Sequence, residues 1–381
     1  MIARRHQVAL AVTALLTAAA ACQNHERQVS AAAGLPAPPA AARGFTLVAS
    51  GDVLPHASVV DRAAFDAGGS GYDFRPMLAG VEPLVSHADL ALCHLETVRD
   101  TADGRPAATA TPKLAEGLAA SGYDACSTAS GHALDDGAPG IRGTLDALDR
   151  AGLRHSGTAR TQAEARSVTL LQAGPAKVAH LSYTAGTGGI ALPSGRPWAV
   201  NLIDERRILA DARAARRAGA DVVVVSLDWG TEGQDAPDQR QIALAQHLTA
   251  ARTDGRPDID LILGGDAHVP QPYEKVNGTW VVYGLGDEVA GEMRDARGAR
   301  DPRADESTIA RFAFAPPAAP GDRWQVTRAE FVPLAYDLDA GRVVDLDRAI
   351  GEGADLVAVR DRIRDVVLAR GAAKDGLVLG E

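Results

Sequence analysis

An aspartate and a histidine two residues apart, Asp266 and His268, stand just after a short apolar run, Leu261–Leu263. The run has the length of a buried strand, and the two glycines that follow it let the backbone turn sharply. A carboxylate and an imidazole on such a turn can converge on one metal ion. The alternative, two polar residues on a solvated turn, also fits this stretch when it is read alone.

Polar side chains follow several other predicted strands in the same way. Strands and helices alternate along the chain, which predicts an α/β fold, and α/β proteins bind ligands at the carboxyl ends of their strands. One such position would mean little, but the repetition favours a shared site over unrelated turns. The six positions are Asp52, Glu96, His132, Asp228, Asp266 and Asp287.

Length and charge limit the class of protein and of partner. The chain has 381 residues, of which 46% are hydrophobic, enough for one large α/β domain or for two domains. The net charge is −10. An acidic protein gains nothing from a phosphate backbone, so we expect no nucleic acid partner.

The N-terminus has the pattern of an export signal. Arg4 and Arg5 form a positive segment, and the apolar stretch 8–21 is too short for a comfortable membrane span. That stretch ends in small residues directly before Cys22, as in bacterial lipoproteins, whose cysteine thiol takes lipid. We therefore expect lipid on Cys22 and a protein held at the outer face of the cytoplasmic membrane. Ordinary cleavage without lipid is the alternative.

Two further cysteines, Cys93 and Cys126, stand near the ends of predicted strands. In an exported protein such a pair can form a disulfide. The sequence does not establish the separation of the two Cα atoms that a disulfide requires. Two buried thiols therefore stay an alternative.

A family resemblance is carried by six blocks: Gly51–Val53, His94–Thr97, Ser130–Asp135, Asp228–Glu232, Asp266–Val269 with Gln271 and Pro272, and Tyr283–Asp287. In this order and spacing they resemble the CapA family of poly-γ-glutamate capsule synthesis proteins. The resemblance covers about residues 45–333. It implies the α/β fold of the calcineurin-like metallophosphoesterases, a sandwich of two mixed β-sheets flanked by helices.

The resemblance also implies a divalent metal site at the strand ends. Carried over residue by residue, it implies Asp52, Glu96 and His268 as metal ligands and His132 as a catalytic acid or base. Carboxylates and imidazoles bind divalent cations, and a bound metal can turn water into a nucleophile near neutral pH. Four more side chains are expected to support the ligands without binding the ion: His56, His94, Glu232 and Asp287.

The chain departs from the family pattern at five positions. The family has histidine where Asp228 and Asp266 stand, asparagine where Gly131 and Asp287 stand, and often asparagine where Gly188 stands. We expect Asp228 and Asp266 to be metal ligands as well. An oxygen-rich site prefers manganese, magnesium or calcium to zinc, because harder cations favour oxygen ligands.

Two functions are consistent with this site. The first is a membrane-anchored, metal-dependent hydrolase or transferase, linked to capsule or poly-γ-glutamate synthesis, that acts on a phosphoester or amide polymer. The second is a divergent, non-catalytic protein that binds or helps to assemble an envelope polymer. In both, the partners are an envelope polymer or the capsule machinery, and the membrane through the lipid anchor.

Four segments follow from these expectations. Residues 1–21 would be a lipoprotein signal peptide. Residues 22–44, rich in alanine and proline, cannot bury a core and would form a disordered tether. Residues 45–340 would be the CapA-like domain, and residues 341–381 a helical C-terminal extension.

Overall fold

The computed structural model describes residues 43–96, 110–291, 299–319 and 322–380. The predicted signal peptide, and the predicted tether apart from Arg43 and Gly44, lie outside these residues. Among the helices that are described, none combines the length and the apolar character needed to cross a membrane.

The larger sheet is organised around β1 (Phe45–Leu54), which is buried along nearly its whole length. β1 runs parallel to β2 and, in its first half, antiparallel to β14. From Asp52 to Leu54 it pairs in parallel with β13 (Asp287–Ala290), with a register shift between Asp52 and Val53. The strands pair in the order β16 (Arg342–Asp345), β15 (Gln325–Asp337), β14 (Glu306–Ala315), β1, β2 (Leu90–Leu95), β3 (Ala125–Ser127) and β4 (Arg154–Ser156).

The smaller sheet has a parallel centre and antiparallel edges. Its strand β7 (Val222–Asp228) is buried at every residue, which suits its run of four valines because both faces of the sheet are covered. The strands pair in the order β11 (Tyr273–Val276), β12 (Thr279–Val282), β10 (Leu261–Gly265), β7, β6 (Ala176–Thr184) and β5 (Thr169–Ala173).

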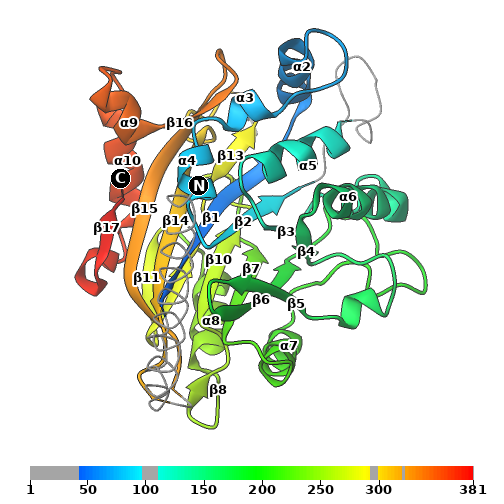
Figure 1. Ribbon diagram of the computed structural model, residues 1–381, viewed down its shortest axis with the longest axis vertical. Helices are drawn as coiled ribbons and strands as arrows, with labels where there is room; N and C mark the ends of the chain where they lie inside the picture. The colour runs from blue at the N-terminus through cyan, green and yellow to red at the C-terminus, as the bar shows by residue number, and fades with distance from the viewer. Residues whose placement is uncertain (1–42, 97–109, 292–298, 320–321, 381) are drawn as a thin grey trace, which may run out of the picture. The chain divides into compact units, whose positions relative to one another are not determined.

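The two sheets pack face to face between layers of helices (Figure 1). Leu47 and Phe312 of the larger sheet share one apolar core with Val224 and Leu261 of the smaller sheet. Other cores lie under the helices α2 (Ala57–Asp66), α5 (Thr111–Ala120) and α6 (Gly137–Ala151) on the larger sheet, and α7 (Glu205–Arg217) and α8 (Gln239–Ala250) on the smaller one. The predicted architecture of two mixed sheets flanked by helices is confirmed.

The segment expected to be a helical extension also contributes strands. It contains α9 (Leu346–Gly351) and α10 (Val357–Val367), but β16 and β17 (Leu377–Leu379) both pair with β15. The chain beyond residue 340 is therefore part of the larger sheet.

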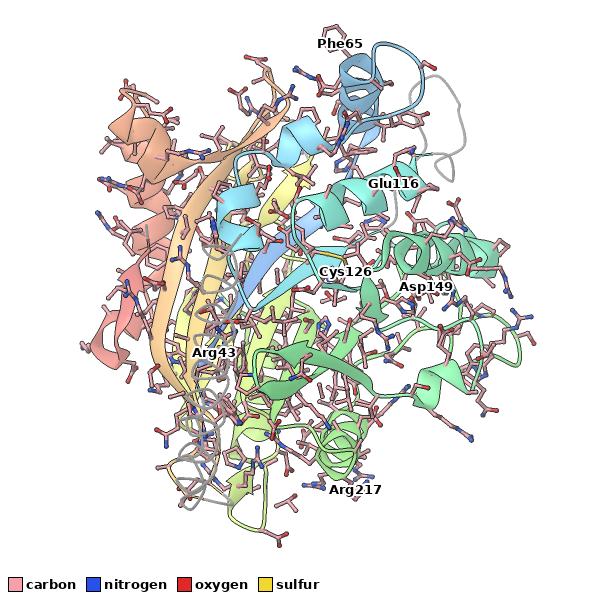
Figure 2. All side chains as sticks on the ribbon, in the orientation of Figure 1. Arg43, Phe65, Glu116, Cys126, Asp149 and Arg217 are labelled. Atoms are coloured by element: carbon pink, nitrogen blue, oxygen red, sulfur yellow. A yellow bond between two sulfur atoms is a disulfide. The ribbon has the colours of Figure 1, made fainter. Side chains whose placement is uncertain are left out.

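Cys93 of β2 and Cys126 of β3 form a disulfide, visible beside the Cys126 label in Figure 2. The two residues are register partners on parallel strands, with their Cα atoms 4.5 Å apart. Of the two alternatives that the sequence leaves open, the structure thus has the disulfide and not two buried thiols. It links the strands one residue before His94 and Ser127, the next pair in register.

Candidate metal centre

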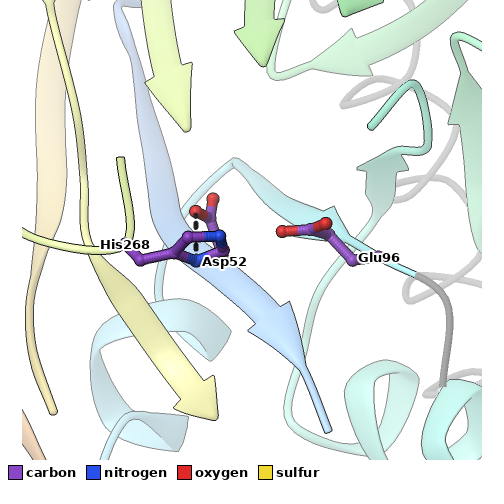
Figure 3. Close-up of side chains that lie close together, drawn as sticks. All are labelled: Asp52, Glu96 and His268. Carbon is purple, nitrogen blue, oxygen red and sulfur yellow. Dashed lines mark ion pairs between the residues drawn. The ribbon is translucent and has the colours of Figure 1, made fainter. Parts of the chain in front are cut away.

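Asp52 of β1, Glu96 just after β2 and His268 in the loop after β10 each bring one ligand atom within 4.8 Å of the others. Figure 3 shows these three side chains facing a common point. All are buried, with exposed fractions of 1%, 2% and 6%. The structure thus brings together three of the ligands that the sequence predicts.

The Asp52 carboxylate lies against the carboxyl end of β10. Its Oδ2 accepts a hydrogen bond from the backbone N–H of Asp266 at 3.0 Å. A Cβ atom on Gly265 would lie 2.5 Å from Asp52 Oδ1, so glycine is needed for this close approach. No hydrogen-bond partner for Oδ1 exists in the part of the chain that the structure describes.

Glu96 leaves a second buried oxygen unpaired. Its backbone N–H donates to the Val53 carbonyl at 3.0 Å, which holds Glu96 beside β1. Its Oε1, like Asp52 Oδ1, finds no partner among the described residues. Unpaired buried oxygens cost free energy, whereas one cation between the two carboxylates would satisfy both. The donor set of Asp52, Glu96 and His268 therefore fits a divalent cation.

His268 is oriented by Asp287, the first residue of β13. His268 Nδ1 lies 2.8 Å from Asp287 Oδ1 and 3.8 Å from Asp52 Oδ2. Asp287 is the register partner of Asp52 across β1 and β13, which explains why both carboxylates reach the same ring. A hydrogen bond on Nδ1 leaves Nε2 for a metal ion, as is usual when a carboxylate supports a histidine ligand.

A second group of candidate ligands shares Glu96. His94, Glu96 and Asp228 also place ligand atoms within 4.8 Å of one another, and all three are buried. His94 Nε2 lies 3.1 Å from Asp228 Oδ1, and His94 Nδ1 lies 2.7 Å from Ser127 Oγ. The sequence predicts only a supporting role for His94, whereas its ring stands among the candidate ligands.

Asp228 is the last residue of β7, and its second carboxylate oxygen, Oδ2, also accepts hydrogen bonds. Asp228 Oδ2 accepts from the backbone N–H of Gly131 at 3.0 Å and from the Thr184 hydroxyl at 2.6 Å. This carboxylate thereby ties β7 to the end of β6 and to the loop that carries His132.

Burial and crowding shift the proton affinities of the cluster. Burial raises the pKa of Asp52 to about 6 and that of Asp266 to about 7, and burial and Asp228 raise the pKa of Glu96 well above its usual range. Burial alone would lower the pKa of His94, but the hydrogen bond to Asp228 and the charge of Asp52 raise it to about 10. A divalent cation would compete with these protons.

Asp266 and His132 stand outside both groups of candidate ligands. Asp266 has a left-handed backbone (φ 74°) and contacts Asp52 through its own N–H. His132 is partly exposed, and its Nδ1 lies 2.8 Å from Asp135 Oδ2. Asp135 therefore orients the ring of the predicted acid or base.

Two of the four predicted supporting residues lie further out. His56 Nδ1 accepts a hydrogen bond from the backbone N–H of Gly291 at 2.8 Å, so it holds the end of β13. Glu232 is exposed, and its charge contributes to the raised pKa of Asp287, whose main cause is burial.

Ser127 and Thr184 belong to the centre although the sequence reasoning missed them. Neither residue type signals metal chemistry. The register of the strands places them there. Ser127 pairs with His94 across β2 and β3, and Thr184 pairs with Asp228 across β6 and β7.

Comparison with known proteins identifies a family for most of this domain. The model of the bacterial capsule synthesis protein family PGA_cap matches residues 46–292. The PGA biosynthesis protein CapA of Bacillus subtilis is 29% identical over 169 residues, 44% of this chain and 42% of that protein. A probable polyglutamine synthesis accessory protein of Mycobacterium tuberculosis is 29% identical over 216 residues, 53% of this chain and 55% of that protein. The chain thus spans about half the length of these relatives.

Among solved structures, a putative 5'-nucleotidase from Staphylococcus aureus superposes with a TM-score of 0.47 at 14% identity, over 84% of this chain and 58% of that one. A likeness of this size supports no conclusion about the chemistry of this chain.

Proposed function

The chain belongs to the PGA_cap family of bacterial capsule synthesis proteins, and from this premise we propose that it is a metal-dependent hydrolase of the cell envelope. In this proposal, Asp52, Glu96 and His268 hold a divalent cation. The substrate is a phosphoester or amide polymer of the envelope, and the process is capsule or poly-γ-glutamate synthesis, as the names of the relatives suggest.

One observation carries the proposal. Two buried carboxylate oxygens, Asp52 Oδ1 and Glu96 Oε1, have no hydrogen-bond partner within the described residues and stand beside the same imidazole. Such oxygens are costly in a protein that never binds a cation. An arrangement selected only for stability would pair them or replace them with apolar side chains.

The composition of the cluster favours manganese, magnesium or calcium over zinc. In the first group of candidate ligands, the carboxylates of Asp52 and Glu96 stand beside one oriented imidazole, that of His268. Hard oxygen donors in excess of nitrogen donors suit the harder cations. A bound cation would polarise the substrate and lower the pKa of a water molecule.

His132 supplies the proton transfer in this proposal. Asp135 Oδ2 lies 2.8 Å from its Nδ1 and orients the ring, and an imidazole can give a proton to a leaving group or take one from water. The loop of His132 is tied to the centre through the hydrogen bond from the Gly131 N–H to Asp228. The chain carries a net charge of −10, so an anionic polymer would approach the centre through the cation.

A second candidate function is that of a non-catalytic protein that binds or assembles an envelope polymer. One observation favours it: Asp228, expected to be a ligand, has both oxygens occupied by hydrogen bonds from the protein. A centre with fewer ligands can keep a cation as a bridge to an anionic polymer without hydrolysing it.

The proposal also places the protein outside the cytoplasm, on a lipid anchor at Cys22. The disulfide between Cys93 and Cys126 supports this location, because structural disulfides form and persist in oxidising compartments.

Titration of the metal-free protein with manganese and with zinc tests the cation site. The wild type should show a saturable rise in melting temperature, larger for manganese, because ligand that binds only the folded state stabilises it by about 2.7 kcal/mol at 100 times the Kd. Asp52→Asn and Glu96→Gln should abolish the rise, whereas Glu116→Gln, at an exposed residue of α5, should retain it. No response of the wild type to any divalent cation would exclude the hydrolase and leave only cation-free polymer binding.

Hydrolysis assays then separate the two functions. Release of phosphate or of glutamate from model polymers, dependent on manganese and lost in His132→Gln, would support the hydrolase. Saturable cation binding without turnover of any polymer would favour the assembly protein.

A further inference from the structure

We propose that the centre holds one divalent cation, at Asp52, Glu96 and His268. The hydrogen bond between His94 and Asp228 prevents the second group of candidate ligands from binding another ion. The inference rests on the proposed cation site and adds its stoichiometry and the role of His94. By distance alone, both groups qualify and they share Glu96. Their hydrogen bonds distinguish them.

His94 has no nitrogen left for a metal ion. Its Nε2 faces the Asp228 carboxylate, which only accepts, so Nε2 is a donor. Its Nδ1 faces Ser127 Oγ, and the Ser127 hydroxyl donates to the Cys93 carbonyl at 3.3 Å. Whether the single proton of that hydroxyl serves the Cys93 carbonyl or Nδ1, Nδ1 is hydrogen-bonded to Ser127. Both ring nitrogens are therefore engaged in hydrogen bonds, and neither has a lone pair free for coordination.

The Asp228 carboxylate is also engaged in hydrogen bonds. Its Oδ1 accepts from His94, and its Oδ2 accepts from the Gly131 N–H and the Thr184 hydroxyl. Three of the four lone-pair sites of this carboxylate are therefore used, and the one that remains, on Oδ1, lies beside the N–H of the His94 ring, which disfavours a cation there. Of the second group, Glu96 alone keeps an unpaired buried oxygen among the described residues.

The first group shows the opposite pattern. Asp52 Oδ1 and Glu96 Oε1 have no partner in the described part of the chain, and the hydrogen bond of His268 to Asp287 uses only Nδ1. Each of the three residues thus keeps one ligand atom available. An ion bound by this group would satisfy both buried oxygens at once.

Metal counting tests the inference without an activity assay. Metal-free wild type is equilibrated with excess manganese, freed of unbound ion, and analysed by elemental mass spectrometry. Electron paramagnetic resonance of the same sample distinguishes an isolated manganese ion from two ions coupled through a shared carboxylate. We expect one ion per chain with the spectrum of an isolated ion. Two coupled ions would overturn the inference while leaving the proposed function standing, and no bound ion would overturn both.

The variant His94→Asn tests the role of the pair. It frees Asp228 Oδ1, so Asp228 and Glu96 can bind a second ion, and the count should rise from one to two. His247→Asn makes the same change at an exposed histidine of α8 and should bind one ion. A count that stays at one in folded His94→Asn would refute the claim that the pair excludes the second ion. If this variant does not fold, the wild-type count and spectrum still decide the stoichiometry.

Discussion

Carboxylates that are alike in type behave differently in this centre because of their partners. Asp52 and Glu96 each keep an oxygen without a partner among the described residues, whereas Asp228 accepts hydrogen bonds from three groups. Glu288, next to Asp287, is a third case: it is fully buried, yet both its oxygens are satisfied by hydroxyl groups. Its role is therefore structural, and its protonation affects the stability of the fold.

Glu288 should make folding stability depend on pH. The Tyr123 hydroxyl donates to one carboxylate oxygen at 2.6 Å and the Ser50 hydroxyl to the other at 2.8 Å, but burial dominates and raises the Glu288 pKa from 4.5 to about 7. The folded state then binds the proton more tightly than the unfolded chain. The contribution of Glu288 to the free energy of unfolding is largest below pH 4.5 and falls as the pH rises. It is lost above pH 7.

Glu288→Gln removes this titration. Its free energy of unfolding relative to wild type should rise by up to about 3 kcal/mol between pH 5 and pH 8. Urea denaturation at the two pH values measures the change, and the exposed Glu116→Gln of α5 should show none. An equal difference at both pH values would mean that Glu288 does not titrate in this range.

At the scale of secondary structure elements, the end of β10 must pass close to β1 for the centre to form. In Gly265→Ala the new methyl group would meet Asp52 Oδ1 at 2.5 Å and His94 Cδ2 at 3.3 Å. The carboxylate has to move, so manganese affinity should fall about 10–100-fold, as for other changes beside metal ligands. Isothermal titration measures it. Gly143→Ala in α6, where a Cβ meets nothing within 4 Å, should leave the affinity unchanged.

At the same scale, the disulfide between β2 and β3 stabilises the fold. It closes a loop with a sequence separation of 33 residues, which corresponds to about 3–4 kcal/mol of chain entropy in the unfolded state. The double variant Cys93→Ala with Cys126→Ala should lose about that much unfolding free energy in urea, whereas Cys22→Ala should lose none. Equal stabilities would show that pairing and packing of the strands suffice without the link.

Sequence patterns predict which residues stand at the ends of strands, but they do not predict which distant strands pair. The positions of Asp52, Glu96 and His268 follow from strand ends and from the family resemblance, and the structure brings them together. The contacts of His94 and Asp287 depend on which distant strands pair and in what register. A one-residue shift of β13 would turn Asp287 away from His268, and no local pattern specifies that pairing.

At the scale of the whole molecule, both sheets supply side chains to the candidate metal centre. Asp52 and Glu96 come from the larger sheet, Asp228 and His268 from the smaller one, and the shared core between the sheets fixes their separation. The match to the family model, residues 46–292, contains every one of these side chains. The strands β14 to β17 lie beyond it and widen the larger sheet, so they support the centre from a distance.

The whole molecule must also be brought to its substrate, and we predict that lipid on Cys22 does this. Arg4 and Arg5 precede an apolar stretch that ends in four alanines directly before Cys22, the pattern of a lipoprotein signal. The residues after Cys22 are rich in alanine and proline and would act as a tether between the membrane and the domain.

Fractionation of cells that express the native chain or Cys22→Ala tests this anchor. The wild type should remain with the membrane after a high-salt wash, because acyl chains bind through the hydrophobic effect and not through charge. Cys22→Ala should be released, and Gln23→Ala, a change at the next residue, should behave as the wild type. Mass spectrometry of the mature N-terminus should detect acyl groups only when Cys22 is present. Membrane retention of Cys22→Ala equal to that of the wild type would show that another part of the protein holds it there.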